Sequence, residues 1–189
     1  MLKLTLDTNC IEHGELRARA VEVGAELAAF SVSRNETTGS PFACHLRTIS
    51  VIPEQSAWKD GAWADGVWAD RVWKSGPDVA YTREDGSESR GDPFEDVLSV
   101  ISNHSFPPPE GRKHLSDGQR RQFRDAMILS LHAQHRRDVF VSGDERAFIS
   151  AGRRERLERM LGTRIRTPAE AIELLAQFPK TSGAEGSRG

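Results

Sequence analysis

The chain has 189 residues, of which 37% are hydrophobic and 29% are charged, and its formal net charge is -2. This length and composition suit one compact domain and leave no room for a second. No stretch approaches the ~18 apolar residues that a membrane helix needs, and the first strand-like segment reaches Asp7 too early for a secretion signal. We therefore expect a protein without membrane segments that stays in the cytoplasm. Cys10 and Cys44 lack the number and spacing of a disulfide framework or zinc site, which predicts reduced packing thiols.

Hydrophobic patterns predict a strand, helix, strand unit at the N-terminus. Leucines at every second position predict a strand over residues 2–6. Apolar residues at helical spacing predict a helix over residues 12–23, which Gly24 ends. Further strands are predicted over residues 27–33 and 47–52. This order favours a parallel sheet covered by helices.

A small internal repeat follows, with tryptophan at every fifth position. Its members are Trp58, Trp63, Trp68 and Trp73. A period of five fits neither a strand face nor a helix face, so we interpret the repeat as part of an insertion at about 54–92. Its rings either pack on the protein or a second subunit, or stack on nucleobases. Residues 81–91 are rich in Gly, Ser and charge and are predicted to be a mobile loop.

Helices and short strands alternate in the second half of the chain. Helices are predicted over residues 94–101, 116–135 and 168–175, around Phe148, and around Leu157 and Leu161, and strands over 139–141 and 163–166. His132 and His135 share one face of the long helix but have no third ligand motif, so we interpret them as packing or surface histidines. Residues 179–189 are predicted to be a disordered tail.

Four carboxylates stand at positions suited to chemistry. Asp7, Glu36 and Asp144 each follow a predicted strand, and Asp125 lies on the long helix. Parallel strands deliver their carboxyl ends to one edge of a sheet. Carboxylates gathered there repel one another unless a hard cation such as Mg²⁺ or Mn²⁺ neutralises them. The pattern therefore predicts a metal site able to generate a hydroxide nucleophile for phosphodiester hydrolysis.

Other acids compete for places in this set. Glu22 or Glu26 would replace Glu36 if the second strand were shifted along the sequence. Glu145 adjoins Asp144, but successive side chains diverge, so we expect it to face solvent or to cap the following helix.

Together these segments resemble the ordered acidic motifs of the PIN-domain nucleases. The matching residues are Leu6-Asp7-Thr8-Asn9, Glu36, Arg124-Asp125-Ala126, Val139-Phe140-Val141-Ser142-Gly143-Asp144, and a closing segment over 161–175. The resemblance implies a three-layer α/β/α sandwich around a mostly parallel sheet, spanning residues 1–178. It also implies a metal-dependent endoribonuclease, and many members of this family are toxins paired with antitoxins.

Carried over by position, the resemblance assigns a role to each acid. Asp7, Asp125 and Asp144 would hold Mg²⁺ or Mn²⁺, with Glu36 as a further ligand or a group that orients water. Asn9 and Ser142 would support the pocket. The resemblance also implies RNA as substrate, an antitoxin protein as partner and a homodimer.

Basic residues outnumber acidic ones between residues 112 and 166, which permits an anionic partner near that half. Arg120, Arg121 and Arg124 precede Asp125 on the long helix, and they either hold RNA phosphates or are solvated or paired.

Two other functions stay open. An aspartyl-nucleophile phosphatase would use Asp7 after the first strand, although Asn9 stands where such enzymes normally carry a second Asp. A catalytically silent RNA-binding or complex-forming module would bind RNA or a partner without consuming it.

Overall fold

The computed structural model describes residues 1–30, 49–52, 77–150 and 152–181. The strands are β1 (Lys3–Leu6), β2 (Glu26–Phe30), β3 (Ser50–Ile52), β4 (Val79–Thr82), β5 (Glu88–Gly91), β6 (Val139–Val141) and β7 (Arg164–Arg166). The helices are α1 (Gly14–Glu22), α3 (Phe94–Ile101), α4 (Asp117–Gln134), α5 (Arg153–Leu161) and α6 (Pro168–Ala176). There are also two short 3-10 helices, η1 (Thr8–Cys10) and η3 (Pro109–His114), and a short π-helix, η4 (Glu145–Ile149). Glu36, Cys44 and the four tryptophans lie outside the described residues.

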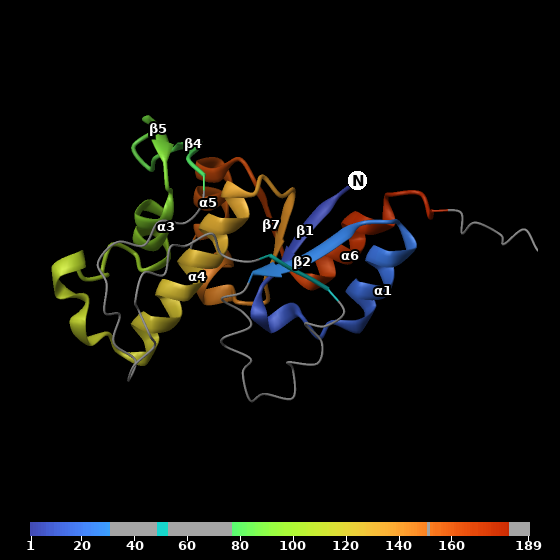
Figure 1. Ribbon diagram of the computed structural model, residues 1–189, viewed down its shortest axis with the longest axis horizontal. Coiled ribbons are helices and arrows are strands. Elements are labelled where there is room, and N and C mark those ends of the chain that lie inside the picture. The colour runs from blue at the N-terminus through green and yellow to red at the C-terminus, as the bar shows by residue number, and fades with distance from the viewer. Residues whose placement is uncertain (31–48, 53–76, 151, 182–189) are drawn as a thin grey trace, which may run out of the picture.

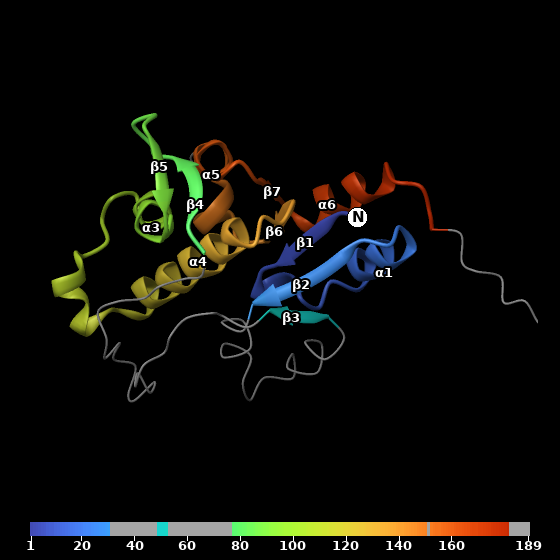
Figure 2. The same ribbon diagram turned by 45° about the horizontal axis from the view of Figure 1, so that its top comes forward.

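Five strands form one parallel sheet in the order β3-β2-β1-β6-β7. Figure 2 shows β1, β2 and β3 side by side. β1 lies at the centre, and its register pairs Leu6 with Val141 of β6. The two strands therefore end level with each other. The parallel sheet predicted from the strand, helix, strand order is confirmed.

Alternating strand residues feed two separate apolar clusters. Leu4 and Val139 belong to a cluster with residues of α1 and α6. Phe140 and Ile165 belong to the other cluster, with residues of α3, α4 and α5. Successive strand residues point to opposite faces, so each sheet face is covered by its own helices, as Figure 1 shows. The chain is thus an α/β protein whose arrangement is compatible with a three-layer fold.

Local sequence signals correctly predicted several helix ends. Ser116 is the N-cap of α4 and forms a capping box with Gln119. Pro168 is the first residue of α6. Gly24 follows α1 with a φ of 66°, the left-handed conformation that glycine adopts at low cost.

The loop predicted over residues 81–91 is wrong, because β4 and β5 pair there as an antiparallel hairpin. Its turn is closed by the Arg83 N–H, which donates to the Ser87 carbonyl at 2.8 Å. Gly86 supplies a left-handed φ of 86° in that turn. Tyr81 is buried and donates its hydroxyl to Asp96 at 2.6 Å, which holds the hairpin against α3. The polar composition of this segment favoured a loop, but the contact of Tyr81 with α3 holds a pair of strands there.

The predicted tail begins later than residue 179. Thr181 donates both its N–H and its hydroxyl to the Glu22 carbonyl, each at 2.9 Å, and so ties this end to α1. Residues 182–189 lie outside the described part. Over the described ranges, no helix combines the length and the apolar character that crossing a membrane requires.

Candidate active site

The carboxyl ends of β1 and β6 bring Asp7 and Ser142 together. The Asp7 N–H donates to the Val141 carbonyl at 2.9 Å, which continues the strand pairing by one residue. Asp7 is only 4% exposed. One of its carboxylate oxygens accepts from the Thr8 N–H at 2.7 Å and the other accepts from the Ser142 hydroxyl at 2.6 Å. A buried carboxylate needs such donors to offset the cost of its burial. The two hydrogen bonds also fix the orientation of the Asp7 carboxylate.

Ser142 also reaches the second acid. Its Oγ accepts from the Asp144 N–H at 3.0 Å while its hydroxyl donates to Asp7. One oxygen of the Asp144 carboxylate accepts from the Ala147 N–H at 2.8 Å, which makes Asp144 the N-cap of η4. The half-buried Asp144 side chain is therefore fixed beside the strand end. Ser142 therefore contacts both Asp7 and Asp144, and its supporting role in a pocket stays a prediction.

Asn9 joins the two loops that follow β1 and β6. Its Oδ1 accepts from the Gly143 N–H at 3.1 Å and from the Cys10 thiol at 2.9 Å. Burial raises the pKa of Cys10 to about 12, and the nearby Asp7 charge acts in the same direction. The thiol is therefore protonated at neutral pH and acts as a packing group. The predicted packing role of Cys10 is confirmed, whereas Cys44 lies outside the described residues.

The structure brings together two of the four predicted acids. Asp7 and Asp144 meet through Ser142. Asp125 is half-buried on α4, and within the described ranges no three His, Cys, Asp or Glu side chains are grouped as metal ligands. Glu36 lies outside those ranges. Ser142 contacts the carboxylate of Asp7 and the backbone N–H of Asp144, and the metal site expected from four acids remains a prediction.

Two of the alternative acids lie away from this edge of the sheet. Glu26 begins β2, at the amino end of the strands, where its carboxylate accepts from Arg137 at 2.7 Å. That bond lowers the pKa of Glu26. Glu22 ends α1 and pairs with Arg19 at 2.6 Å. Neither can replace Glu36. Glu145 is exposed, as the sequence predicted.

The three arginines proposed to contact RNA differ in their surroundings. Arg120 forms an ion pair with Asp117 at 2.8 Å. Arg121 is exposed and Arg124 is half-buried, and the two lie about one helical turn apart on α4. Arg120 would have to leave Asp117 in order to hold a phosphate.

His132 is a packing histidine, as predicted, but its contacts could not be read from the helix pattern. It is fully buried, with Nδ1 at 2.9 Å from Thr5 Oγ1 and Nε2 at 2.5 Å from Thr163 Oγ1. It therefore joins α4 to the first strand and to the turn before the last one. Burial lowers the pKa of His132 to about 3, so the ring is neutral.

The sequence matches no protein-family model and no curated protein sequence. The resemblance to the PIN-domain nucleases therefore rests on the motifs alone.

Proposed function

We propose that this protein is a Mg²⁺- or Mn²⁺-dependent endoribonuclease with a three-layer, PIN-like domain over residues 1–178. The observation that carries the proposal lies where β1 and β6 end level with each other. There Ser142 bonds the carboxylate of Asp7 and the backbone N–H of Asp144. The carboxyl edge of a parallel sheet is where such folds gather polar chemistry. The order of the acids along the chain also matches the order of the acidic motifs in the PIN-domain nucleases, which the sequence resembles.

The donor chemistry of this pair fits the proposed ion. Mg²⁺ is commonly held by one or two carboxylates together with water and substrate phosphate oxygens. Asp7 and Asp144 would supply these carboxylates, with Asp125 and Glu36 as the further acids of the set. When bound, the ion supplies a water of lowered pKa and neutralises phosphate charge. Ser142 and the Ala147 N–H keep the two carboxylates in place before any ion binds.

The residue two positions after Asp7 disfavours the aspartyl-phosphatase alternative, because such enzymes normally carry a second Asp there and this chain has Asn9. Asn9, at the position of the second phosphatase acid, is occupied by Gly143 and Cys10.

The test is calorimetric titration with Mn²⁺ together with cleavage of a broad RNA panel under the same conditions. We compare the wild type, the double variant Asp7→Asn/Asp144→Asn, and Glu145→Gln as a matched control, because Glu145 is an exposed acid adjacent to the site. The double variant should lose metal binding and cleavage together, and the control should keep both. Circular dichroism verifies that each variant is folded.

Other outcomes contradict the proposal. Cleavage that survives in the double variant or in excess chelator would remove the metal mechanism. Metal binding without cleavage of any RNA would favour the silent binding module. A stable phosphoaspartate at Asp7 would revive the phosphatase.

An antitoxin partner, a homodimer and a cytoplasmic location belong to the same proposal. Light scattering at micromolar concentration tests the homodimer, and a monomer there would remove it. RNA contact by Arg120, Arg121 and Arg124 would be weakened by added salt, since phosphate contacts release counterions.

A further inference from the structure

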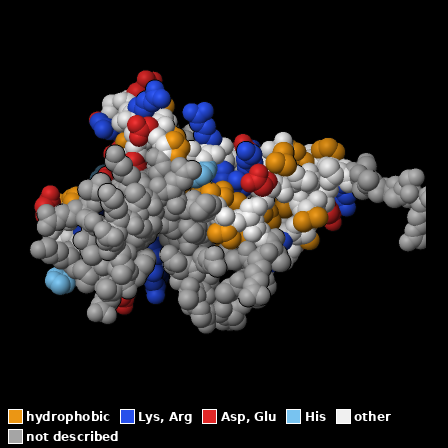
Figure 3. Space-filling view, viewed as in Figure 1, with side chains coloured by type: hydrophobic (Ala, Val, Ile, Leu, Met, Phe, Trp, Pro, Cys, Tyr) orange, Lys and Arg blue, Asp and Glu red, His pale blue; other side chains and the backbone are white. Residues whose placement is uncertain are grey.

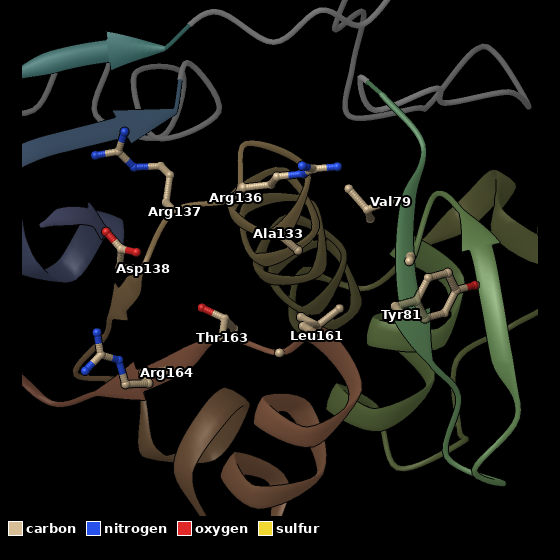
Figure 4. Close-up of a pocket in the computed structure, with 11 residues that line it drawn as sticks. Val79, Tyr81, Ala133, Arg136, Arg137, Asp138, Leu161, Thr163 and Arg164 are labelled. Carbon is tan, nitrogen blue, oxygen red and sulfur yellow. The ribbon is translucent and has the colours of Figure 1, made fainter. Parts of the chain in front are cut away.

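β7 lies at one end of the parallel sheet. Among the described strands it pairs with β6 alone, and Figure 4 shows Arg164 where the strand begins. A strand in this position normally presents unpaired backbone N–H and C=O groups, which can pair with a strand of another chain. Each outward-facing backbone group of β7 therefore needs a partner, which is water, a side chain or another strand.

Ile165 is the residue of β7 whose backbone faces outward. The Ser142 N–H donates to the Arg166 carbonyl at 3.0 Å, so the backbone of Arg166 faces β6. Neighbouring residues of a strand bond to opposite sides, and the N–H and C=O of Ile165 consequently face away from the sheet. Ile165 is fully buried, so these two groups depend on partners from the protein itself.

One ion pair satisfies both groups. The Ile165 N–H donates to Glu158 Oε1 at 2.7 Å, and the Ile165 carbonyl accepts from Arg166 Nη1 at 2.6 Å. The same two side-chain atoms bond each other at 2.5 Å. The carboxylate and the guanidinium together offer β7 one acceptor and one donor, which is what a neighbouring strand would offer.

The helix before β7 sets the position of Glu158. Glu158 lies on α5, between the buried residues Leu157 and Met160. Gly162 ends this helix with a left-handed φ of 63°, and β7 begins two residues later. This short connection brings Glu158 within reach of a backbone group seven positions ahead. The Arg166 and Glu158 side chains are 28% and 25% exposed, so their contact is partly protected from screening by salt.

The surroundings of β7 carry charges of both signs. Figure 3 shows Lys and Arg side chains beside Asp and Glu side chains between the β4–β5 hairpin and β1, where Figure 1 shows β7. The first residue of the strand, Arg164, is exposed. Short edge strands and charged side chains are means by which proteins keep sheet edges from pairing. The ion pair adds to these two features by covering the backbone itself.

We propose that the Glu158–Arg166 ion pair closes the β7 edge against strand addition by a second copy of this chain. Two identical edges, once uncovered, offer each other the same donor and acceptor, and a two-fold axis between them lets both bonds form. A homodimer of the wild type would then use another surface. This inference does not rest on the proposed nuclease activity.

The first experiment is light scattering of the full chain at low and high micromolar concentration. In Glu158→Ala the mass should rise with concentration to about twice that of the wild type or more. Glu158→Gln keeps an acceptor oxygen for the Ile165 N–H and should stay close to the wild type. The matched control is Arg156→Ala, because Arg156 and Glu84 form an ion pair of nearly the same exposure that joins α5 to the hairpin. This control should keep the wild-type mass.

Hydrogen exchange of the Ile165 N–H shows where the copies meet. At low concentration this amide should exchange about tenfold faster in Glu158→Ala than in the wild type, because its acceptor is gone. At high concentration the exchange should slow again, since a strand of the second copy then accepts from it.

Several results would overturn the proposal. Glu158→Ala with the wild-type mass at every concentration would do so, as would association without renewed protection of the Ile165 N–H, which would place the contact on another surface. Equal association of Arg156→Ala would show that loss of any ion pair suffices. Circular dichroism verifies folding, and if Glu158→Ala is unfolded, Arg166→Ala is the variant to measure. It uncovers the Ile165 carbonyl, and a wild-type mass of this folded variant would equally contradict the proposal.

Discussion

The hydroxyl of Ser142 connects the two acids that close neighbouring strands. The sequence placed Asp7 and Asp144 after strands, and the structure adds the hydrogen bonds that orient them. The bond from Ser142 to Asp7 joins residues 135 positions apart, so no local pattern could have shown it. The sequence indicated only that an acid follows each of these two strands.

His132 illustrates a residue whose environment changes its chemistry. Because burial lowers the pKa of His132 to about 3, below the 6.5 of an unperturbed histidine, the unfolded chain binds more protons between these values. The free energy of unfolding should therefore fall as the pH drops below 6.5. At pH 5.5 the expected loss is about 1.4 kcal/mol. Urea unfolding at pH 7.5, 6.5 and 5.5 measures it.

The matched variants are His132→Gln and His104→Gln. Glutamine does not titrate, so His132→Gln should lose most of the pH dependence. His104 is largely exposed, and His104→Gln should keep the pH dependence of the wild type. An unchanged pH dependence in His132→Gln would show that this ring is not the group responsible. His135, whose pKa is also lowered by burial, contributes in the same direction.

At the scale of elements, α4 begins with a capping box. Ser116 accepts from the Gln119 N–H at 3.2 Å, and the Gln119 side chain accepts from the Ser116 N–H at 2.9 Å. Ser116→Ala should lower the free energy of unfolding by about 1 kcal/mol, because it removes the acceptor for that N–H. Ser116→Asp keeps an acceptor and should stay within a few tenths of the wild type. Equal stability of the alanine and aspartate variants in urea would contradict the capping role.

The β4–β5 hairpin shows where element-level prediction fails. β4 carries Val79, Tyr81 and Thr82, which favour a strand, but β5 has none of the β-branched or aromatic residues that do so. The stability of the hairpin comes from outside the segment, since Tyr81 is bound by Asp96 of α3. Gly86, which has a left-handed φ in the turn, is a local signal that favours a hairpin, whereas the polar composition of the segment favours a loop.

At the scale of the molecule, Phe140 links the sheet to the helices on one face. It is fully buried, and its ring meets His132 edge-on at 5.6 Å and Phe148 at 5.0 Å between centroids. Phe140→Ala should lower the free energy of unfolding by about 3–5 kcal/mol, through lost transfer energy and a cavity. Phe178, 39% exposed, is the control, and Phe178→Ala should cost less than ~0.5 kcal/mol. Similar losses for both variants in urea would contradict this account of the core.

The sequence by itself determined the parallel α/β class, most helix ends and the acids at the ends of β1 and β6. Periodicity, caps and strand-end residues are local, and the rule that parallel strands end at one edge turns them into a site. Only the tertiary structure decided the Ser142 bridge and the exclusion of Glu26 from that edge. These depend on strand order and on contacts between distant residues, such as the hydrogen bond from Ser142 to Asp7. No spacing along the chain encodes such a contact.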